Sequence, residues 1–266
     1  MGETGFAAAE DIARAFVDAR RAGRALGRYP GPAPETMAQA YAVQDAAIAH
    51  DGRVVGGWKL GKITSPTAER LGANRLAGPI FTDQIVTVDG VRDVAMSIFA
   101  AGFGAAEAEF LLRIGTAPDP AKADYTIAEA TALIDAVHAG IEIASSPYPA
   151  INADGPPVTA SDYGNNNGLV IGDAIAGWQD GDINGWGVEL RINGAVIGTG
   201  RGADMLDGPF GAAAFLFNLA ARRGIALSAG QWISSGAVTG VHPVVAGDRV
   251  EATFDGRYPV RCTITG

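Results

Sequence analysis

Two glutamates, Glu107 and Glu109, lie two residues apart in an apolar segment at residues 105–114. The segment has the character of a β-strand, in which residues two apart project from the same face. Both carboxylates are therefore expected on one face, opposite Ala108 and Phe110. Two aligned acids inside an apolar strand are costly to bury unless a cation or a proton compensates them. The fold must therefore bring this face to solvent or to a source of positive charge.

A third carboxylate, Glu142, lies in a second short apolar run at residues 139–144. Three convergent carboxylates would suit a hard divalent ion such as Mg²⁺ or Mn²⁺, which prefers oxygen ligands. The alternative is an acidic strand edge that faces solvent and binds no ion.

The composition narrows the class of protein and of partner. The chain has 266 residues, of which 48% are hydrophobic and 37 are glycines, as in a globular, turn-rich protein. Its net charge of −9, without a lysine or arginine block, argues against nucleic acid and anionic membranes as partners. No run of about 20 apolar residues and no signal peptide is evident, so a cytoplasmic protein is expected. The single Cys262 excludes internal disulfides and cysteine-rich metal sites.

Apolar residues recur at helical spacing in four segments. Two of these segments lie near the N-terminus, and the other two interrupt a long stretch of strand-like sequence. The predicted helices span residues 7–22, 36–50, 127–138 and 207–223.

From Val54 onward, short apolar runs separated by glycine, proline and aspartate predict strands. The pairs Asn193-Gly194 and Asp255-Gly256 mark tight turns between such runs. The pattern is that of an α+β protein. A small helical N-terminal part is expected at residues 1–90, and a large, mostly β body at residues 91–266.

A glycine-rich segment, Gly56–Gly61, surrounds Lys59. In a strand, Trp58 and Leu60 would face one side and Lys59 the other, while the glycines would let a ligand approach the backbone. A lysine beside an acidic cluster could bind an anion, or move a proton if its pKa is lowered. The alternative is a lysine that extends to solvent.

Asp162 begins a polar stretch that runs through Asn165 to Gly168. Its composition predicts a loop, and a polar turn that satisfies its own hydrogen bonds is one interpretation. In the other interpretation, its amide side chains bind an oxygenated substrate.

Two further patterns point away from other enzyme classes. Gly198–Gly202 follows a predicted hairpin instead of opening a βαβ helix, so a dinucleotide site is rejected. His50, His138 and His242 lie far apart, and no Gly-x-Ser-x-Gly motif accompanies them. A serine hydrolase is therefore disfavoured.

Taken together, the motifs resemble the fumarylacetoacetate hydrolase superfamily. The branch is that of the 2-keto-4-pentenoate hydratases, the 2-oxohept-4-ene-1,7-dioate hydratases and the 4-oxalocrotonate decarboxylases. The resemblance covers nearly the whole chain, and its fragments are specific in their order and spacing. They are residues 40–44, 57–61, Glu107-Ala-Glu109, Glu142, Asp162 with Asn165, Leu206–Pro209, Ser234–Gly236, Thr239 and residues 247–250.

The resemblance implies a large mixed β-roll or barrel-like catalytic domain that binds Mg²⁺ or Mn²⁺ and a small 2-oxo acid. Relatives form homo-oligomers, so a homo-oligomer is expected. The implied sites are metal ligands Glu107, Glu109 and Glu142, catalytic residues Lys59 and Asp162, and substrate-binding residues Asn165, Ser235 and Thr239.

The chain departs from the family pattern in three places. Hydratases often carry an aspartate where this chain has Arg75–Gly78, and often a serine near the position of Asn165. The segment after Lys59, at residues 61–65, is one residue longer. These departures leave the metal ligands intact but affect the expected apparatus for proton transfer.

The implied activity is that of a hydro-lyase of aromatic compound catabolism. It would add water to a 2-hydroxy-2,4-dienoate to give a 4-hydroxy-2-oxo acid, with a divalent ion stabilising the enolate. Three carboxylates around such an ion leave a charge of −1, so Lys59 is expected near the substrate to supply positive charge.

Two alternatives use the same enolate stabilisation, a 4-oxalocrotonate-type decarboxylase and an acylpyruvate-type carbon–carbon hydrolase. Hydrolases of the family usually add a histidine–glutamate pair on an N-terminal segment. No histidine precedes His50, which favours the hydratase. A second kind of alternative is a catalytically silent homologue that binds a 2-oxo acid.

Overall fold

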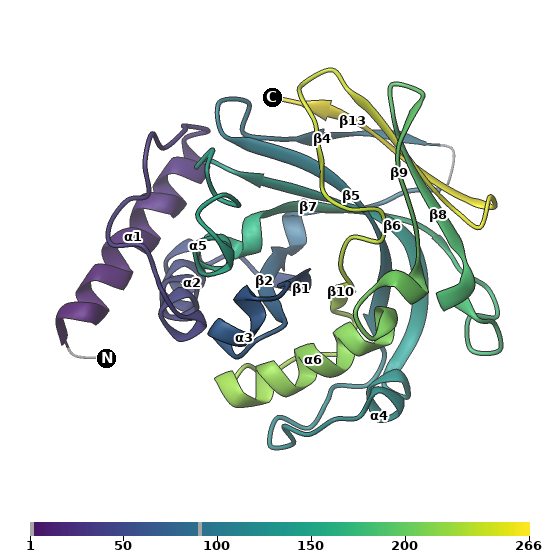
Figure 1. Cartoon of the computed structure of the whole chain (residues 1–266), viewed down its shortest axis with the longest axis horizontal. Helices are drawn as coiled ribbons and strands as arrows, with labels where there is room; N and C mark the ends of the chain where they lie inside the picture. Colours follow the sequence, from purple (N-terminus) through teal and green to yellow (C-terminus); the bar gives the residue numbers. More distant parts are fainter. Residues whose placement is uncertain (1–2, 90–91) are drawn as a thin grey trace.

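The structure, a computed structural model, describes residues 3–89 and 92–266. The fold is of the α+β class, as the sequence predicts, and its helices flank two β-sheets (Figure 1). The helices are α1 (Glu3–Arg21), α2 (Met37–Asp51), α3 (Thr67–Leu71), α4 (Ile127–Thr131), α5 (Pro156–Ser161) and α6 (Gly208–Arg223).

The larger sheet contains eight of the described strands, in the order β2-β1-β10-β5-β6-β7-β3 with β11 beside β5. It is mixed, because β1 runs parallel to β10 whereas β5 runs antiparallel to β6. The sheet curls, so that one of its faces lies inside the molecule (Figure 1). Its strands are β1 (Val55–Lys62), β2 (Arg75–Phe81), β3 (Ile85–Thr87), β5 (Phe103–Ile114), β6 (Ile134–Ser146), β7 (Asn166–Ala174), β10 (Trp232–Ser234) and β11 (His242–Pro243).

The smaller sheet contains five of the described strands, in the order β4-β13-β12-β8-β9. It covers the outer face of the larger sheet near β5 and β6 (Figure 1). Its strands are β4 (Asp93–Ser97), β8 (Gly187–Ile192), β9 (Ala195–Arg201), β12 (Arg249–Phe254) and β13 (Tyr258–Thr265).

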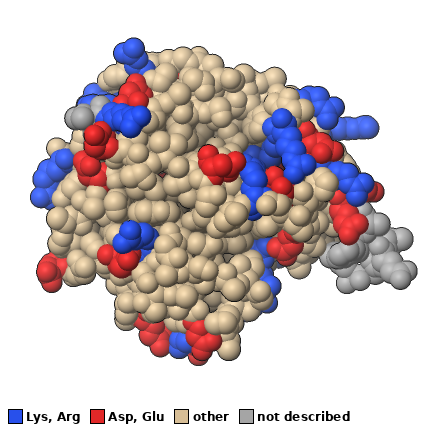
Figure 2. All heavy atoms as spheres, turned by 180° about the vertical axis from the view of Figure 1, so that it is seen from behind, with Lys and Arg blue, Asp and Glu red and all other residues tan. Residues whose placement is uncertain are grey.

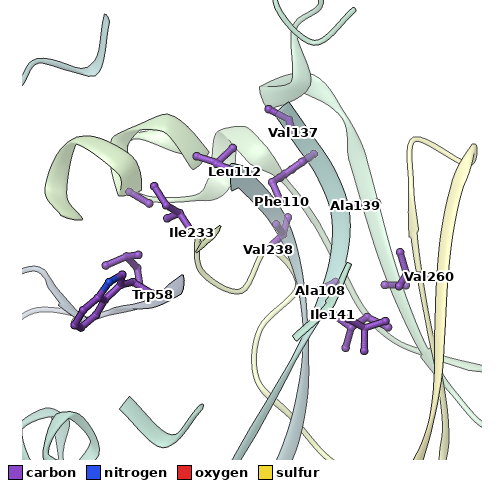
Figure 3. Close-up of a cluster of buried hydrophobic side chains, with 14 of the residues drawn as sticks. Trp58, Ala108, Phe110, Leu112, Val137, Ala139, Ile141, Ile233, Val238 and Val260 are labelled. Carbon is purple, nitrogen blue, oxygen red and sulfur yellow. The ribbon is translucent and has the colours of Figure 1, made fainter. Parts of the chain in front are cut away.

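The main core lies between the two sheets. Ala108 and Phe110 of β5 point to this side and are fully buried. The rings of Phe110 and Phe254 meet edge to face, with their centroids 5.1 Å apart. Figure 3 shows part of this core, in which Ile141 belongs to the larger sheet and Val260 to the smaller one. Burying one large apolar side chain stabilises the fold by ~1.5–3 kcal/mol. The contact between Phe110 and Phe254 therefore favours the orientation in which Ala108 and Phe110 face the smaller sheet.

The inward face of β5 lines the inside of the curl. Leu111 points there and packs with apolar side chains of β2 and β7. Strand alternation places Glu107 and Glu109 on the same face as Leu111. Their predicted orientation, opposite Ala108 and Phe110, is therefore confirmed.

The N-terminal helices form a layer beside the larger sheet. Helices α1 and α2 pack against each other. Helix α2 starts with a capping box, in which the side chains of Thr36 and Gln39 each accept a hydrogen bond from the other residue's backbone N–H. Gly52, with φ 70°, caps its C-terminal end. Helix α6 packs on β1 and β5, with Pro209 in its first turn and Gly224 after its last residue, as the sequence predicts.

The prediction of a helix at residues 127–138 is wrong in its second half. Helix α4 ends at Thr131, and β6 begins at Ile134. The following residues pair with β5, and His138 lies opposite Leu111. The hydrogen bonds of this long ladder, which depend on distant residues, override the local helical spacing.

Both predicted tight turns are confirmed. Asn193 and Gly194, with φ 52° and 84°, join β8 to β9. Asp255 and Gly256, with φ 51° and 64°, join β12 to β13. Positive φ at both central residues is the geometry that such pairs favour.

Within the described residues, no helix combines the length and the apolar character needed to cross a bilayer. Figure 2 shows acidic and basic side chains interspersed on the face turned away in Figure 1. The domain boundary near residue 90 stays a prediction, and strands from both sides of it share the larger sheet.

Candidate metal centre

Strands β5 and β6 bring three glutamates together on the inner face of the larger sheet. Glu107 lies directly opposite Glu142 in the antiparallel ladder, and Glu109 is two residues further along, opposite Gly140. One carboxylate oxygen from each glutamate lies within 4.8 Å of the other two. The three residues are 0–4% exposed, so the acids converge in the interior and not on a solvent-facing edge.

Two carboxylate oxygens in this cluster lack a hydrogen-bond donor among the described residues. Glu109 Oε2 accepts from Ser234 Oγ at 2.5 Å and from Gly236 N at 2.8 Å, whereas its Oε1 has no donor. Glu142 Oε1 accepts from Asn166 Nδ2 at 2.9 Å, whereas its Oε2 has no donor. Buried carboxylate oxygens without donors are costly. A cation between them would remove that cost.

The three carboxylates have the spacing and the chemistry of a divalent-ion site. Oxygens that share one ion at 2.0–2.6 Å lie at most about 4–5 Å apart, which matches the spread of these oxygens. Carboxylate oxygens favour hard ions such as Mg²⁺, Mn²⁺ and Ca²⁺ over soft ones. Glu107, Glu109 and Glu142 could therefore hold such an ion with only small movements of their side chains.

Lys59 lies on β1 and points into the same cluster. Its Nζ is 3.2 Å from Glu142 Oε1 and donates to Asn165 Oδ1 at 3.3 Å. The side chain is 4% exposed, so the interpretation of Lys59 as a lysine that extends to solvent is wrong. Burial lowers the pKa of Lys59, but the three carboxylates, Glu142 foremost, outweigh burial and hold the pKa above its ordinary value. Lys59 is therefore a cation in the metal-free protein at neutral pH.

Two of the glutamates have raised pKa values. Burial, opposed by Lys59 and reinforced by repulsion from Glu142, raises the pKa of Glu107 to about 7. Burial and repulsion from Glu142 and Glu107 raise the pKa of Glu109 well above its usual range. Near neutral pH, the metal-free cluster therefore carries protons that a bound cation would displace.

Binding of a divalent ion near pH 7 is expected to release about one proton. Because protons and the ion compete for Glu107 and Glu109, the affinity should fall as the pH is lowered from about 8 to about 6. Titration calorimetry with Mn²⁺, in buffers that differ in ionisation enthalpy, measures the number of protons released. Binding at pH 7 without proton release would contradict these two residues as ligands.

Asp162, the second predicted catalytic residue, forms a buried ion pair. Its Oδ1 accepts from Arg20 Nε at 2.6 Å, and its Oδ2 accepts from Arg20 Nη2 at 2.9 Å and from Ser146 Oγ at 2.6 Å. Both carboxylate oxygens are therefore occupied. A role for Asp162 in proton transfer stays a prediction, and these contacts favour a positioning role.

The three predicted substrate-binding residues differ in their contacts. Asn165 contacts Lys59 directly, and its Nδ2 donates to Asn152 Oδ1 at 2.9 Å. Ser235 is 3% exposed, and its Oγ has no partner among the described residues. Thr239 is half-buried, and its Oγ1 lies 3.3 Å from His242 Nε2. A substrate-binding role for these three residues stays a prediction.

Sequence reasoning assigned no role to three residues that support the cluster, namely Ser234, Asn166 and Arg20. Ser234 could have been found, because it belongs to the Ser234–Gly236 fragment that carries part of the family resemblance. Asn166 follows the predicted Asn165, and its side chain is the one that reaches Glu142. Arg20 lies 142 positions from Asp162 in the chain, and no local pattern indicates that pairing.

Sequence comparison identifies relatives of the chain, although no protein-family model matches it. The chain is 32% identical over 130 residues to the 4-oxalocrotonate decarboxylase of Pseudomonas putida. This match covers 49% of each protein, so it spans about half the length of that relative. Over 248 residues, the chain is 28% identical to the 2-keto-4-pentenoate hydratase 1 of Dechloromonas aromatica strain RCB. This match covers 89% of this chain and 90% of that protein.

Solved structures share the fold. The 4-oxalocrotonate decarboxylase from Pseudomonas putida G7, in complex with magnesium and adipate, superposes with a TM-score of 0.80 at 24% identity, over 96% of this chain and 97% of that one. The fumarylpyruvate hydrolase from Pseudomonas aeruginosa, in complex with Mn²⁺ and pyruvate, gives a TM-score of 0.57 at 15% identity, over 78% and 88%. At these identities, the likeness concerns the fold.

Proposed function

We propose that the chain belongs to the fumarylacetoacetate hydrolase superfamily and is a divalent-metal-dependent enzyme that acts on a 2-oxo acid. Its sequence likeness to the hydratase and its fold support this proposal. One observation carries the proposal. Glu107, Glu109 and Glu142 converge in the interior beside the cationic Lys59, and two of their oxygens lack donors among the described residues. The proposed ion is Mg²⁺ or Mn²⁺, bound by these three glutamates.

The proposed reaction is the hydration of a 2-hydroxy-2,4-dienoate. A proton adds at C5 while the 2-hydroxyl proton is lost, which gives the conjugated 2-oxo-3-enoate. Water then adds across the C3–C4 double bond, with its hydroxyl at C4 and a proton at C3. The product is a 4-hydroxy-2-oxo acid, so the enzyme is a hydro-lyase.

The residues of the cluster have distinct proposed roles. When bound, the divalent ion supplies a Lewis acid that stabilises negative charge on the substrate's 2-oxygen. Lys59 brings the summed charge of the three glutamates and the ion from −1 to zero, so that a substrate monoanion is not repelled. Its Nζ is also the proposed proton donor, because the positive charge of a bound divalent ion would offset the carboxylates that raise its pKa. General acids contribute ~10²–10⁴-fold to rate in other enzymes. Ser235 Oγ is proposed to bind a substrate oxygen.

The charges around the site favour a substrate with a single carboxylate. Among the described residues, four cationic side chains are less than 10% exposed, and each already pairs with a carboxylate. A second buried carboxylate on the substrate would therefore lack a cation and would be costly. The four pairs are Lys59 with Glu142, Arg20 with Asp162, Arg75 with Asp207 and Arg223 with Asp45.

A second candidate is a decarboxylase of a dicarboxylate such as 4-oxalocrotonate. It is favoured by the 32% identity to the Pseudomonas putida decarboxylase and by the TM-score of 0.80. The match to the hydratase, however, extends over 89% of the chain, against 49% for the decarboxylase. The hydratase is therefore the first proposal.

A panel of substrates separates the candidates. With Mg²⁺, 2-hydroxypenta-2,4-dienoate should lose its ultraviolet absorbance as 4-hydroxy-2-oxopentanoate forms, and a chelator should stop the reaction. We expect kcat/KM for this monocarboxylate to exceed that for 4-oxalocrotonate by at least about 10-fold, since an unpaired buried carboxylate costs several kcal/mol. Carbon dioxide release from 4-oxalocrotonate at the higher kcat/KM would favour the decarboxylase. Tight binding of oxalate or pyruvate without turnover of either substrate would favour a silent homologue.

The acylpyruvate hydrolase alternative is tested in the same panel by the cleavage of an acylpyruvate. The homo-oligomeric state and the cytoplasmic location stay predictions, and light scattering of the purified protein measures the first of them.

A further inference from the structure

Arg20 connects the last turn of α1 to the polar loop beside the metal centre. Its guanidinium forms a bidentate pair with Asp162, through Nε to Oδ1 at 2.6 Å and through Nη2 to Oδ2 at 2.9 Å. The Arg20 side chain is 5% exposed and that of Asp162 is fully buried. A planar guanidinium matches a carboxylate in this geometry, and a lysine cannot reproduce both bonds.

The same guanidinium bonds to the chain on either side of the loop. Nη2 donates to the backbone oxygen of Ser145, at the end of β6, at 3.1 Å. Nη1 donates to the backbone oxygen of Asn166, at the start of β7, at 3.2 Å. Arg20 therefore fixes three points around the loop, namely Asp162 at its start, Asn166 at its end and Ser145 on the neighbouring strand.

Between Asp162 and Asn166 the backbone adopts an unfavourable conformation. Tyr163, Gly164 and Asn165 have φ values of 58°, 62° and 57°, so that three successive residues lie in the left-handed region. Residues other than glycine rarely adopt this backbone conformation, and it persists only where contacts with the surrounding structure stabilise it. The bonds of Arg20 to both ends of the segment provide such a constraint.

The two amides at the end of this segment contact the metal centre. Asn165 Oδ1 accepts from Lys59 Nζ at 3.3 Å, and Asn166 Nδ2 donates to Glu142 Oε1 at 2.9 Å. Glu142 Oε1 is thereby engaged, and Oε2 remains the oxygen without a donor. Asn165 and Asn166 therefore connect the left-handed segment to Lys59 and Glu142.

We propose that Arg20 is a positioning residue of the metal centre, which acts through Asp162 and the left-handed segment 163–165 to orient Glu142 and Lys59. The proposal rests on the proposed function, in which Glu142 is a metal ligand. It also assigns Asp162 to positioning, because both of its oxygens bind Arg20 and Ser146. The competing explanation is that Arg20 only attaches α1 to the rest of the protein.

The test measures Mn²⁺ affinity and the electron paramagnetic resonance spectrum of bound Mn²⁺, without substrate, in Arg20→Ala. Outer-shell partners of a metal site typically contribute 10–100-fold to affinity, so a loss of about that size is expected, with an altered spectrum. Arg20 lines a cavity of about 340 Å³, through which methylguanidinium can reach the vacated position. Added methylguanidinium should restore both the affinity and the spectrum.

Two control variants separate positioning from attachment of the helix. Arg21→Ala removes the neighbouring arginine, which lines the same cavity but pairs with Asp51. Phe16→Leu loosens the packing of α1, where Phe16 is 1% exposed, and removes none of the hydrogen bonds of Arg20 or Asp162. Both controls should keep the Mn²⁺ affinity of the unmodified protein. Should Arg20→Ala fail to fold, Arg20→Lys retains the charge, loses the bidentate pair and should also bind Mn²⁺ more weakly.

The possible outcomes are distinct. Unchanged Mn²⁺ affinity in folded Arg20→Ala or Arg20→Lys overturns the positioning role and leaves the proposed function intact. An equal loss in Phe16→Leu, or a loss in Arg20→Ala that methylguanidinium does not restore, shows that Arg20 serves attachment of α1 and also overturns the proposal. Absence of Mn²⁺ binding by the unmodified protein contradicts the proposed metal centre itself, and with it this inference.

Discussion

Replacing Glu109 with glutamine is expected to lower the affinity for Mn²⁺ by at least about 100-fold, since even outer-shell changes cost 10–100-fold. The glutamine oxygen can still accept from Ser234 and Gly236, so the local fold is kept. Its NH₂ group, however, would replace the oxygen that now lacks a donor. The site then loses one negative charge and presents a donor to a cation. Calorimetric titration with Mn²⁺ measures the effect, and turnover at limiting metal should fall in parallel.

The matched control is Glu251→Gln, which alters a partly exposed glutamate on β12 of the smaller sheet. It should leave the Mn²⁺ affinity unchanged. If Glu109→Gln binds Mn²⁺ as tightly as the unmodified protein does, Glu109 is not a ligand.

The same substitution should stabilise the metal-free protein at alkaline pH. The pKa of Glu109 is raised in the folded state by burial and by Glu142 and Glu107. The folded state therefore holds a proton that the unfolded chain has lost, and stability falls as the pH rises towards the folded pKa. Glutamine does not titrate, so the variant should be more stable than the unmodified metal-free protein at about pH 8. Saturating Mg²⁺ should reverse this order, and thermal unfolding with and without Mg²⁺ tests both signs.

Replacing Lys59 with methionine should lower kcat/KM for a 2-hydroxydienoate by about 10²–10⁴-fold, the usual contribution of a general acid. The substitution removes the cation beside Glu142 and leaves the ion and three glutamates with a charge of −1. A substrate monoanion is then repelled, and the proposed proton donor is lost. Loss of one partner of a buried ion pair also destabilises a fold by roughly 3–5 kcal/mol, so metal-free Lys59→Met should unfold at a lower temperature than the unmodified protein.

Lys62→Met is the matched control, because Lys62 lies three residues further along β1 and is exposed. It should keep the activity and the stability of the unmodified protein. Steady-state kinetics of Lys59→Met with saturating Mg²⁺ decides the role of Lys59. Unchanged kcat/KM in this variant would contradict both the electrostatic role and the proton-donor role.

Much of the metal centre could be predicted because it follows from strand alternation. Glu107 and Glu109 share a face because they lie two residues apart, and the same face carries Leu111 into the interior. The turns at Asn193-Gly194 and Asp255-Gly256 were predictable because few other pairs adopt positive φ easily. In each of these cases the information lies within a few residues of the feature.

The features that could not be predicted from the sequence depend on residues distant in the chain. The helix predicted through His138 becomes a strand because β5 offers it a ladder of backbone hydrogen bonds. Asp162 could be recognised as a polar residue of a loop, but its ion pair with Arg20 depends on where α1 packs. Lys59 was expected to move a proton if its pKa were lowered, whereas the three nearby carboxylates raise it. Such effects require the tertiary structure.

The most direct test of the metal centre is anomalous scattering from crystals of the protein grown or soaked with Mn²⁺. We expect a strong manganese peak bounded by carboxylate oxygens of Glu107, Glu109 and Glu142, with pyruvate binding to the same ion when it is added. A manganese peak elsewhere, or an unchanged cluster without manganese at saturating concentration, would contradict the assignment.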